Sequence, residues 1–248
     1  NTEDYISWNW KAGGAGVVNT DGTISSTVSV NDDAGFSIVS YTGTGSAGTV
    51  GHGLSDALEM IIVKNRDQPD AWAVYHSGIA SDAETDYLVL NTDAAAVDNN
   101  NRWNDTAPTA SLFSIGTAVV VNTNTENFIA YCFRSIPGYS KVGSLELNNS
   151  TDGTFIPLGF KPAFFLMKMT ASGHWGIWDD IRNPFNVSGT MLRPNTTNPD
   201  LTGYDIDILS NGVKIRDNHA QMSSGTAIFY AVARHPFGGS NLPLGLAR

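Results

Sequence analysis

Short segments with strand-like patterns of apolar and polar residues recur along this chain. Residues 36–41 have the period of two that is expected of a half-buried strand, with Phe36 and Ile38 on one face. Residues 60–63 and 164–167 are each four consecutive apolar residues. Runs of this length are typical of strands that are covered on both faces. The pattern therefore predicts a protein built mainly from strands.

The same series of segments occurs twice, at an offset of about 100 residues. Each copy holds an alternating strand, a glycine-rich or polar turn, an apolar run that ends in lysine, a tryptophan-containing strand and a closing strand that ends in arginine. The matched ranges are 35–41 with 138–144, 42–46 with 148–153, 60–64 with 164–168, 72–75 with 175–178, and 130–134 with 230–234. Because the offset is far longer than the repeat of a solenoid, we interpret the pattern as a domain duplication.

Turn sequences separate the expected strands. Asp21-Gly22, Asp152-Gly153 and Asn211-Gly212 are dipeptides that favour tight turns. Residues 206–215 therefore predict a hairpin around Asn211-Gly212. Helix is expected only in short pieces, around residues 92–99 or 195–201.

Together these patterns predict an all-β fold of two tandem antiparallel β-sandwich modules related by internal duplication. The first module is expected over residues 35–137 and the second over residues 138–248. Residues 1–34 match neither copy, and we interpret them as the tail of a preceding domain and a linker, docked against the first module or free of it. Within them, residues 5–10 alternate as a strand would.

Composition and charge narrow the possible functions. Charged residues make up 15% of the chain and the formal net charge is −10. Binding to nucleic-acid phosphates requires a basic surface, and an anionic membrane surface would repel this chain. We therefore expect neither nucleic acid nor membrane as a partner. The one cysteine, Cys132, excludes an intrachain disulfide and lies in an apolar segment, so we expect it to be a core residue.

Candidate catalytic and metal-binding groups are sparse. The adjacent carboxylates Asp179 and Asp180 suggest glycoside hydrolysis, but neighbouring residues of a strand point to opposite faces, so a solvated strand end is the preferred interpretation. The five histidines lack zinc-ligand spacing, and no cofactor is expected. Structural calcium at the oxygen-rich residues 98–101, or at Asp205 and Asp207, is the alternative to their being simple turn residues.

Two polar loops are the candidate binding sites. Trp103 lies among polar residues and could stack on a sugar while its neighbours bond the hydroxyl groups; the alternative is a tryptophan that folds back as a lid on the first module. A comparable loop in the second copy contains Arg182 and Asn183. The candidate ligand-binding residues are Asn101, Arg102, Trp103, Asn104, Asp105, Arg182 and Asn183.

Several stretches resemble a module of unknown function found in tail and virion proteins of bacteriophages, particularly marine ones. The resemblance rests on YTGTG, VGHGL, MIIVK and WAVYH in residues 41–76, and continues with WNDTAPT, AYCF, NPFN, FYAVA and HPF in residues 103–237. It covers the chain from about residue 5 to the end. In that family the module often follows a laminin-G-like or concanavalin-like sandwich, and residues 5–14 resemble the last strand of one. The family supplies no catalytic residues to transfer.

The resemblance implies a non-enzymatic virion protein, outside the cell and in contact with other virion proteins. The leading hypothesis is a tail-fibre or tail-tip component that adheres to a host cell-surface glycan, since recognition commonly resides in loops on a rigid β scaffold. A homotrimer is expected by analogy with tail fibres. The alternatives are a purely structural spacer or capsid-decoration module and, third, a polysaccharide depolymerase.

Overall fold

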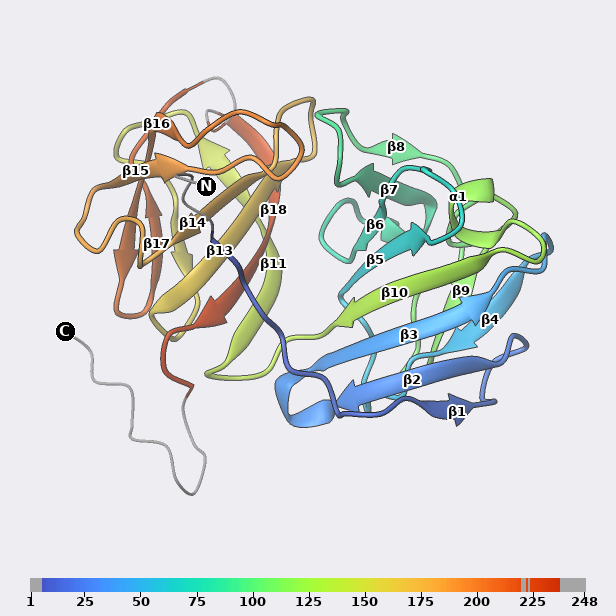
Figure 1. Ribbon diagram of the computed structural model, residues 1–248. Helices are drawn as coiled ribbons and strands as arrows, with labels where there is room; N and C mark the ends of the chain where they lie inside the picture. The colour runs from blue at the N-terminus through green and yellow to red at the C-terminus, as the bar shows by residue number, and fades with distance from the viewer. Residues whose placement is uncertain (1–5, 220–221, 223, 237–248) are drawn as a thin grey trace, which may run out of the picture.

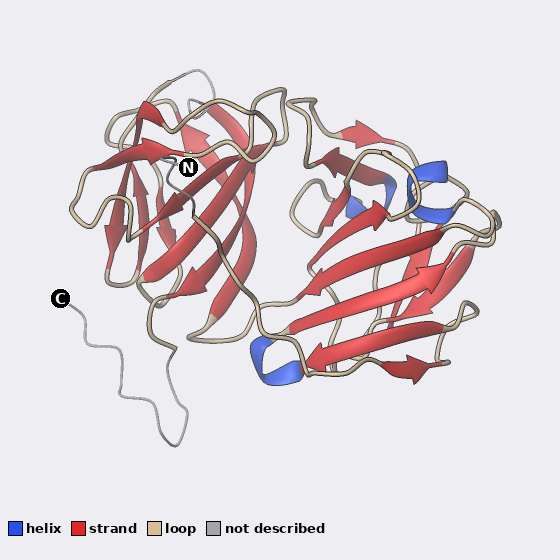
Figure 2. Ribbon diagram, in the orientation of Figure 1, coloured by secondary structure: helices blue, strands red, loops and turns tan. Residues whose placement is uncertain are grey.

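The computed structural model describes residues 6–219, 222 and 224–236 and is built almost entirely from antiparallel strands (Figures 1 and 2). The described residues include one short α-helix, α1 (Val119–Asn122), and two 3₁₀ turns, η1 (Asp32–Ala34) and η2 (Ala83–Thr85). No helix in the described part is long and apolar enough to cross a bilayer. The all-β fold class expected from the sequence is confirmed.

The first unit, residues 17–133, contains a large antiparallel sheet. Its strands, in spatial order, are β1 (Val17–Asn19), β2 (Ser26–Asn31), β3 (Phe36–Thr42), β10 (Asn127–Phe133), β5 (Met60–Asn65), β6 (Ala73–His76), β7 (Asp86–Val89) and β8 (Val97–Asp98). A two-stranded sheet, β4 (Gly48–Gly51) with β9 (Leu112–Ile115), covers one face. Residues 17–31, which the sequence analysis placed outside both modules, form the outer strands β1 and β2 of the large sheet.

The second unit, residues 140–233, is a sandwich of two four-stranded sheets. One sheet has the order β11 (Ser140–Asn148), β18 (Ser224–Ala233), β13 (Pro162–Met169) and β14 (Gly176–Asp179). The other has the order β12 (Phe155–Pro157), β17 (Gly212–Ile215), β16 (Leu201–Leu209) and β15 (Ser188–Met191). The predicted hairpin is present as β16 and β17, and the pairing of Leu209 with Gly212 puts its two-residue turn at 210–211.

Four strands of each unit have the same spatial order. The order β3, β10, β5, β6 in the first unit corresponds to β11, β18, β13, β14 in the second. These eight strands contain most residues of the strand-like matched segments, although Trp72, Trp175, Arg134 and Arg234 lie one residue beyond a strand end. The matched turn segments 42–46 and 148–153 begin at the last residues of β3 and β11. The shared order is in line with a domain duplication, which stays a prediction.

The second unit packs on the first through one face of its β11–β18–β13–β14 sheet. Along β13, Phe164 and Leu166 belong to the core shared with the first unit, whereas Phe165 and Met167 belong to the core inside the second unit. Successive side chains of a strand point to opposite faces, so a strand covered on both sides needs apolar residues at every position. This explains the uninterrupted apolar run at residues 164–167.

The two helical segments considered for residues 92–99 and 195–201 are wrong. The first is loop that ends in strand β8, and the second is loop up to the start of β16 at Leu201. Thr, Asn and Asp, which favour turns over helix, stand at both ends of the first stretch and make up most of the second, where Pro199 also removes a backbone donor.

Candidate functional site

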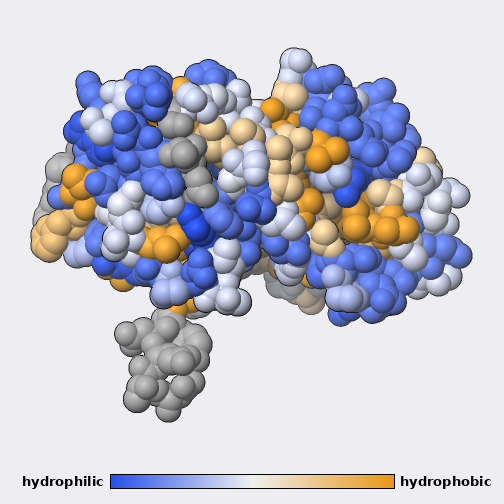
Figure 3. Space-filling model, turned by 90° about the horizontal axis from the view of Figure 1, so that it is seen from above, coloured by the Kyte–Doolittle hydropathy of each residue, from blue (hydrophilic) through white to orange (hydrophobic). Residues whose placement is uncertain are grey.

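A cleft with a volume of about 410 Å³ opens between the two units. Its walls are the outward face of the large sheet of the first unit and the facing side of β13, β14 and β18. Every lining residue is apolar or aromatic, and half-buried Ile38, Ile62 and Tyr131 stand on the first-unit side. Apolar residues are gathered along the join between the two lobes in the space-filling view (Figure 3). We call this feature the inter-unit cleft.

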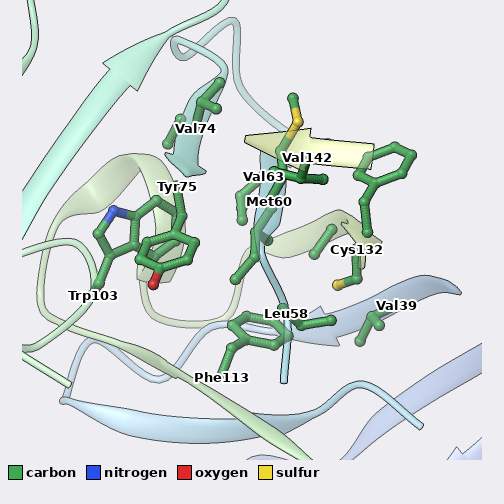
Figure 4. Packing of buried hydrophobic residues seen from close by; sticks show 14 of the residues in the cluster. Val39, Leu58, Met60, Val63, Val74, Tyr75, Trp103, Phe113, Cys132 and Val142 are labelled. Atoms are coloured by element: carbon green, nitrogen blue, oxygen red, sulfur yellow. The ribbon is translucent and has the colours of Figure 1, made fainter. Parts of the chain in front are cut away.

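The strand period of two places these side chains. On β5, Met60 and Ile62 face the inter-unit cleft. Ile61 and Val63 point away from the cleft and are 1% and 0% exposed. The opposite side of the strand belongs to the core of the first unit, where Val63 is in the same apolar cluster as Val39 and Cys132 (Figure 4). The run at residues 60–63 is therefore apolar throughout because the first unit, like the second, has a sheet with two apolar faces.

The N-terminal segment contributes two tryptophans to the cleft. The Trp10 ring lies 5.3 Å from the Phe164 ring and 6.4 Å from the Phe133 ring, both edge-on. Its Nε1 donates a hydrogen bond to the Tyr230 hydroxyl at 3.2 Å, and Trp8 contacts Phe164 at 5.6 Å. Trp10 therefore touches a residue of the first unit and two of the second.

The chemistry of the cleft selects an apolar occupant. Its lining offers hydrogen-bonding side-chain groups only on Trp and Tyr, and those of Trp10 and Tyr230 are bonded to each other. Burial raises the pKa of Tyr230, so its hydroxyl stays protonated. A sugar placed here would leave most of its hydroxyl groups without partners, which costs free energy for each group. The cleft therefore suits hydrocarbon or aromatic groups.

The structure buries the tryptophan expected to stack on a sugar. Trp103 is 1% exposed, its ring meets the Tyr75 ring edge-on at 5.8 Å, and its Nε1 donates to the Asp86 carbonyl at 2.9 Å (Figure 4). A ring covered to this degree has no free face for a ligand. The stacking role is therefore wrong, and the alternative, a tryptophan folded onto the first unit, describes its place.

The neighbours of Trp103 form a closed turn above it. The Arg102 guanidinium lies 3.2 Å from the centre of the Tyr87 ring, a cation–π contact. The Asn101 carbonyl accepts from the Ala118 amide at 3.0 Å. Asn104 and Asp105 are exposed and have left-handed φ values of 54° and 46°. A ligand-binding role for these four residues stays a prediction.

The second candidate loop is held by ion pairs. Arg182 donates to Asp179 at 2.6 Å, to Asp200 at 2.9 Å and to the Ile177 carbonyl at 3.0 Å. These bonds use the guanidinium to fix the loop. Asn183 is half-buried, and its role in binding stays a prediction.

Asp179 and Asp180 do not converge on a common point. Asp179 is paired with Arg182, whereas Asp180 is paired with Arg234 at 3.2 Å and with Lys161 at 3.9 Å. Burial raises the pKa of Asp180, and the two cations oppose that change. The divergence follows from their adjacent positions at a strand end, and the arrangement lacks two carboxylates facing one substrate.

Comparison with known proteins places the chain in a family. A family model described as "Domain of unknown function (DUF7483)" matches residues 1–236. The chain belongs to this family. No curated protein matches it. A solved structure entitled "Crystal Structure of the STIV MCP" is similar over 90% of this chain and 92% of that one, with 12% sequence identity and a TM-score of 0.21. A TM-score this low carries no conclusion about fold or function.

Other reactive groups of this DUF7483 domain are buried in its cores. Cys132 is fully buried, which confirms the core role expected for it, and burial raises the pKa of its thiol. His52 and His76 are also buried, and burial lowers the pKa of both imidazoles. A thiol with a raised pKa is a poor nucleophile.

In the described residues, no group of three or more His, Cys, Asp or Glu side chains is close enough to hold a metal ion. Asp207, considered for calcium, pairs with Arg216 at 2.6 Å, and the Asp205 carbonyl accepts from the Arg216 amide. Asp98 lies opposite Asp86 on neighbouring strands. Structural calcium stays a prediction for these residues.

A groove between the two copies was one expected place for a binding site, but the sequence analysis named none of the residues of the inter-unit cleft, although it contained part of the pattern. The alternation at residues 5–10 marked Trp8 and Trp10 as one face of an extended segment, and both are half-buried while Ser7 and Asn9 are exposed. The apolar runs marked strands with two covered faces. What the pattern could not supply was which two faces meet.

Proposed function

We propose that this domain is a non-enzymatic structural module of a virion protein, in which the two β units act as one rigid body. One observation carries the proposal: a single apolar cluster contains residues of both units, among them Phe36 and Phe133 of the first and Phe164 and Tyr230 of the second. An interface that is continuous with the core does not hinge as loosely packed domains do. A rigid body of this kind suits a spacer or a decoration of the particle surface.

Hydrogen bonds across the join support rigidity. The Trp175 indole donates to the Val89 carbonyl at 2.9 Å, and the Ala96 amide donates to the Thr170 carbonyl at 2.7 Å. The Gly173 amide donates to the Asp93 carbonyl at 2.8 Å. These bonds tie the loop that follows β7 to the turn that follows β13. One edge of the interface is thereby held by three hydrogen bonds.

The structural role is favoured over adhesion to a glycan and over polysaccharide cleavage. Trp103, the residue best suited to stack on a sugar, is in the core, and Asp179 and Asp180 are each neutralised by separate cations. The assignment to a virion rests on the resemblance of the sequence to phage tail and virion modules. On this proposal, the binding partners of the domain are other virion proteins.

Two measurements on a phage that encodes the domain test the proposal. Antibodies raised against the purified domain are applied to intact particles in the electron microscope, and the purified domain is added in excess during adsorption of the phage to its host. The proposal expects labelled particles and unchanged adsorption. Competition for adsorption would establish the adhesion hypothesis instead, and particles that lack the domain when opened and probed would contradict a virion role.

A further inference from the structure

The loop between β14 and β15 presents an unusual amount of apolar surface. Ile181, Phe185 and Val187 are 61%, 82% and 50% exposed. They are three of the eight large hydrophobic residues that are exposed in the described part of the chain, and they fall within seven residues. Exposed apolar groups that cluster in this way mark contact surfaces more often than scattered ones do. We call this segment the 181–187 loop.

Both ends of the 181–187 loop are anchored by side-chain hydrogen bonds. At one end Asp179 accepts from the backbone amides of Ile181 and Arg182, while the Arg182 guanidinium returns a bond to the same carboxylate. At the other end the Asn186 side chain donates to the Ile208 carbonyl at 3.0 Å and accepts from the Ile208 amide at 2.9 Å. Phe185 thus stands on a segment that is fixed on either side.

This anchoring lowers the cost of a contact made by Phe185. Immobilising a loop on association costs free energy, and a loop that the fold has already fixed avoids most of that cost. Aromatic side chains that enter a pocket are also the residues that dominate protein interfaces. The combination of an 82% exposed ring and a fixed backbone is therefore suited to insertion into a partner.

The inter-unit cleft has the complementary properties. Its lining is apolar and includes half-exposed aromatic rings, and its volume of about 410 Å³ exceeds the roughly 150 Å³ that accommodates benzene in a protein cavity. Residues 183–187 carry no charged side chain, so their insertion places no charge in the cleft. Burying a charge there without a partner would oppose binding.

We propose that Phe185 of one copy of this chain inserts into the inter-unit cleft of a second copy. The contact joins two different surfaces, so a pair of molecules keeps one free cleft, on the molecule that supplies Phe185, and one free loop, on the other molecule. Such heterologous contacts form a ring when the rotation closes and a filament when it does not. A ring of three would be the homotrimer expected from the sequence. The proposal goes beyond the structural role above and does not depend on it.

The net negative charge of the chain opposes this association and makes it depend on the salt concentration. Two copies with a formal net charge of −10 each repel one another, while residues 183–187 and the lining of the cleft carry no charged side chain. Added salt screens the repulsion and leaves the apolar contact in place. Self-association is therefore expected to strengthen as the salt concentration rises, whereas a contact made by ion pairs would weaken.

Cysteine cross-linking tests which surfaces meet. The full chain is made as P184C, which places a thiol on an exposed residue beside Phe185 and keeps the ring. It is made separately as L90C, which places a thiol in the half-buried lining of the cleft. Cys132 is fully buried and does not compete for reagent. With a short bis-maleimide, the proposal expects covalent dimers in the mixture of the two variants and not with either variant alone. A mixture of P184C with V119C, whose thiol is at an exposed residue of helix α1, is the matched control.

Four results would overturn the proposal. The first is a mixture of P184C and L90C that gives no more dimer than the control mixture. The second is cross-linking of P184C with itself, which would show a symmetric loop-to-loop contact. The third comes from light scattering without cross-linker. The proposal expects F185N to weaken self-association about tenfold or more and V119N to leave it unchanged, so equal association of the two variants would overturn it. The fourth is a wild-type chain that stays monomeric up to millimolar concentration.

Discussion

The imidazole of His76 and the backbone carbonyl of Phe229 meet across the join, with Nε2 3.2 Å from the oxygen, although 153 residues separate them in the chain. His76 ends strand β6 of the first unit, and Phe229 lies in the central strand β18 of the second. The Gly78 amide donates to Nδ1 at 3.0 Å, so Nε2 carries the proton and donates to Phe229. A neutral imidazole therefore links the two units.

Acid is expected to destabilise the domain through His76. Burial lowers the pKa of His76 from 6.5 to about 4, so the unfolded chain takes up this proton first as the pH falls. The stability contributed by the neutral ring is complete above pH 6.5, decreases from there and is lost below about pH 4; the loss amounts to at most about 3 kcal/mol. The free energy of unfolding in urea, measured at a series of pH values from 7.5 to 4, gives this loss of stability.

The matched variant for this prediction is H76N, which keeps a side-chain amide in place of the imidazole. Carboxylates titrate in the same range, so the difference between the two proteins isolates the contribution of His76. The free energy of unfolding of H76N should fall less steeply between pH 6.5 and 4 than that of the wild type. Equal slopes would show that His76 does not control the acid response.

The W103A variant should lose stability rather than binding. Deleting a buried tryptophan removes its packing against Tyr75 and leaves a cavity, at a cost of about 3–5 kcal/mol. F185A removes an aromatic ring that is 82% exposed and should change the stability of the monomer by less than about 0.5 kcal/mol. Denaturant unfolding compares the two variants. Equal, small changes would mean that Trp103 is not in the core.

Local patterns of the sequence predicted the strands but not their meeting places. The run at residues 60–63 shows that β5 is covered on both sides, because each face of a strand is recorded in alternate residues. Whether Ile62 faces Phe164 depends on segments a hundred residues apart, which no local pattern specifies. The stacking role predicted for Trp103 was wrong for the same reason. The sequence neighbours of Trp103 are polar, while Tyr75, which its ring contacts, is distant in the chain.

Lys64 and Lys168, the lysines that end the two apolar runs, make equivalent contacts. Each Nζ donates to the carbonyl of the next residue, Asn65 or Met169, at 2.6 Å, and to a carbonyl of the following turn. Lys168 is 1% exposed and burial lowers its pKa to about 8. We expect K168M to cost about 2 kcal/mol, because buried carbonyls lose their donor.

K64M is the matched control for K168M. Lys64 is only half-buried, so water can replace its bonds, and the variant should cost less than about 1 kcal/mol. Thermal and urea unfolding give both values. A loss at Lys64 that equals or exceeds the loss at Lys168 would contradict the account of these turns.

Trp10 should stabilise the join more than either unit alone. W10A removes its contacts with Phe133, Phe164 and Tyr230, and because the ring is half-buried we expect a loss of about 2 kcal/mol, below the range for fully buried tryptophans. Limited proteolysis should then cut the connection near residues 134–139 faster than in the wild type. A variant that is destabilised without faster cleavage there would assign Trp10 to one unit only.

Calorimetry of the wild-type domain tests the central claim, that two units share one core and behave as one body. For 248 residues that unfold together, the enthalpy at the midpoint is about 170 kcal/mol, and the van't Hoff enthalpy equals the calorimetric enthalpy. We predict a single transition with this ratio near one, at a concentration where the chain is monomeric. Two transitions, or a van't Hoff enthalpy near half of the calorimetric value, would contradict the claim.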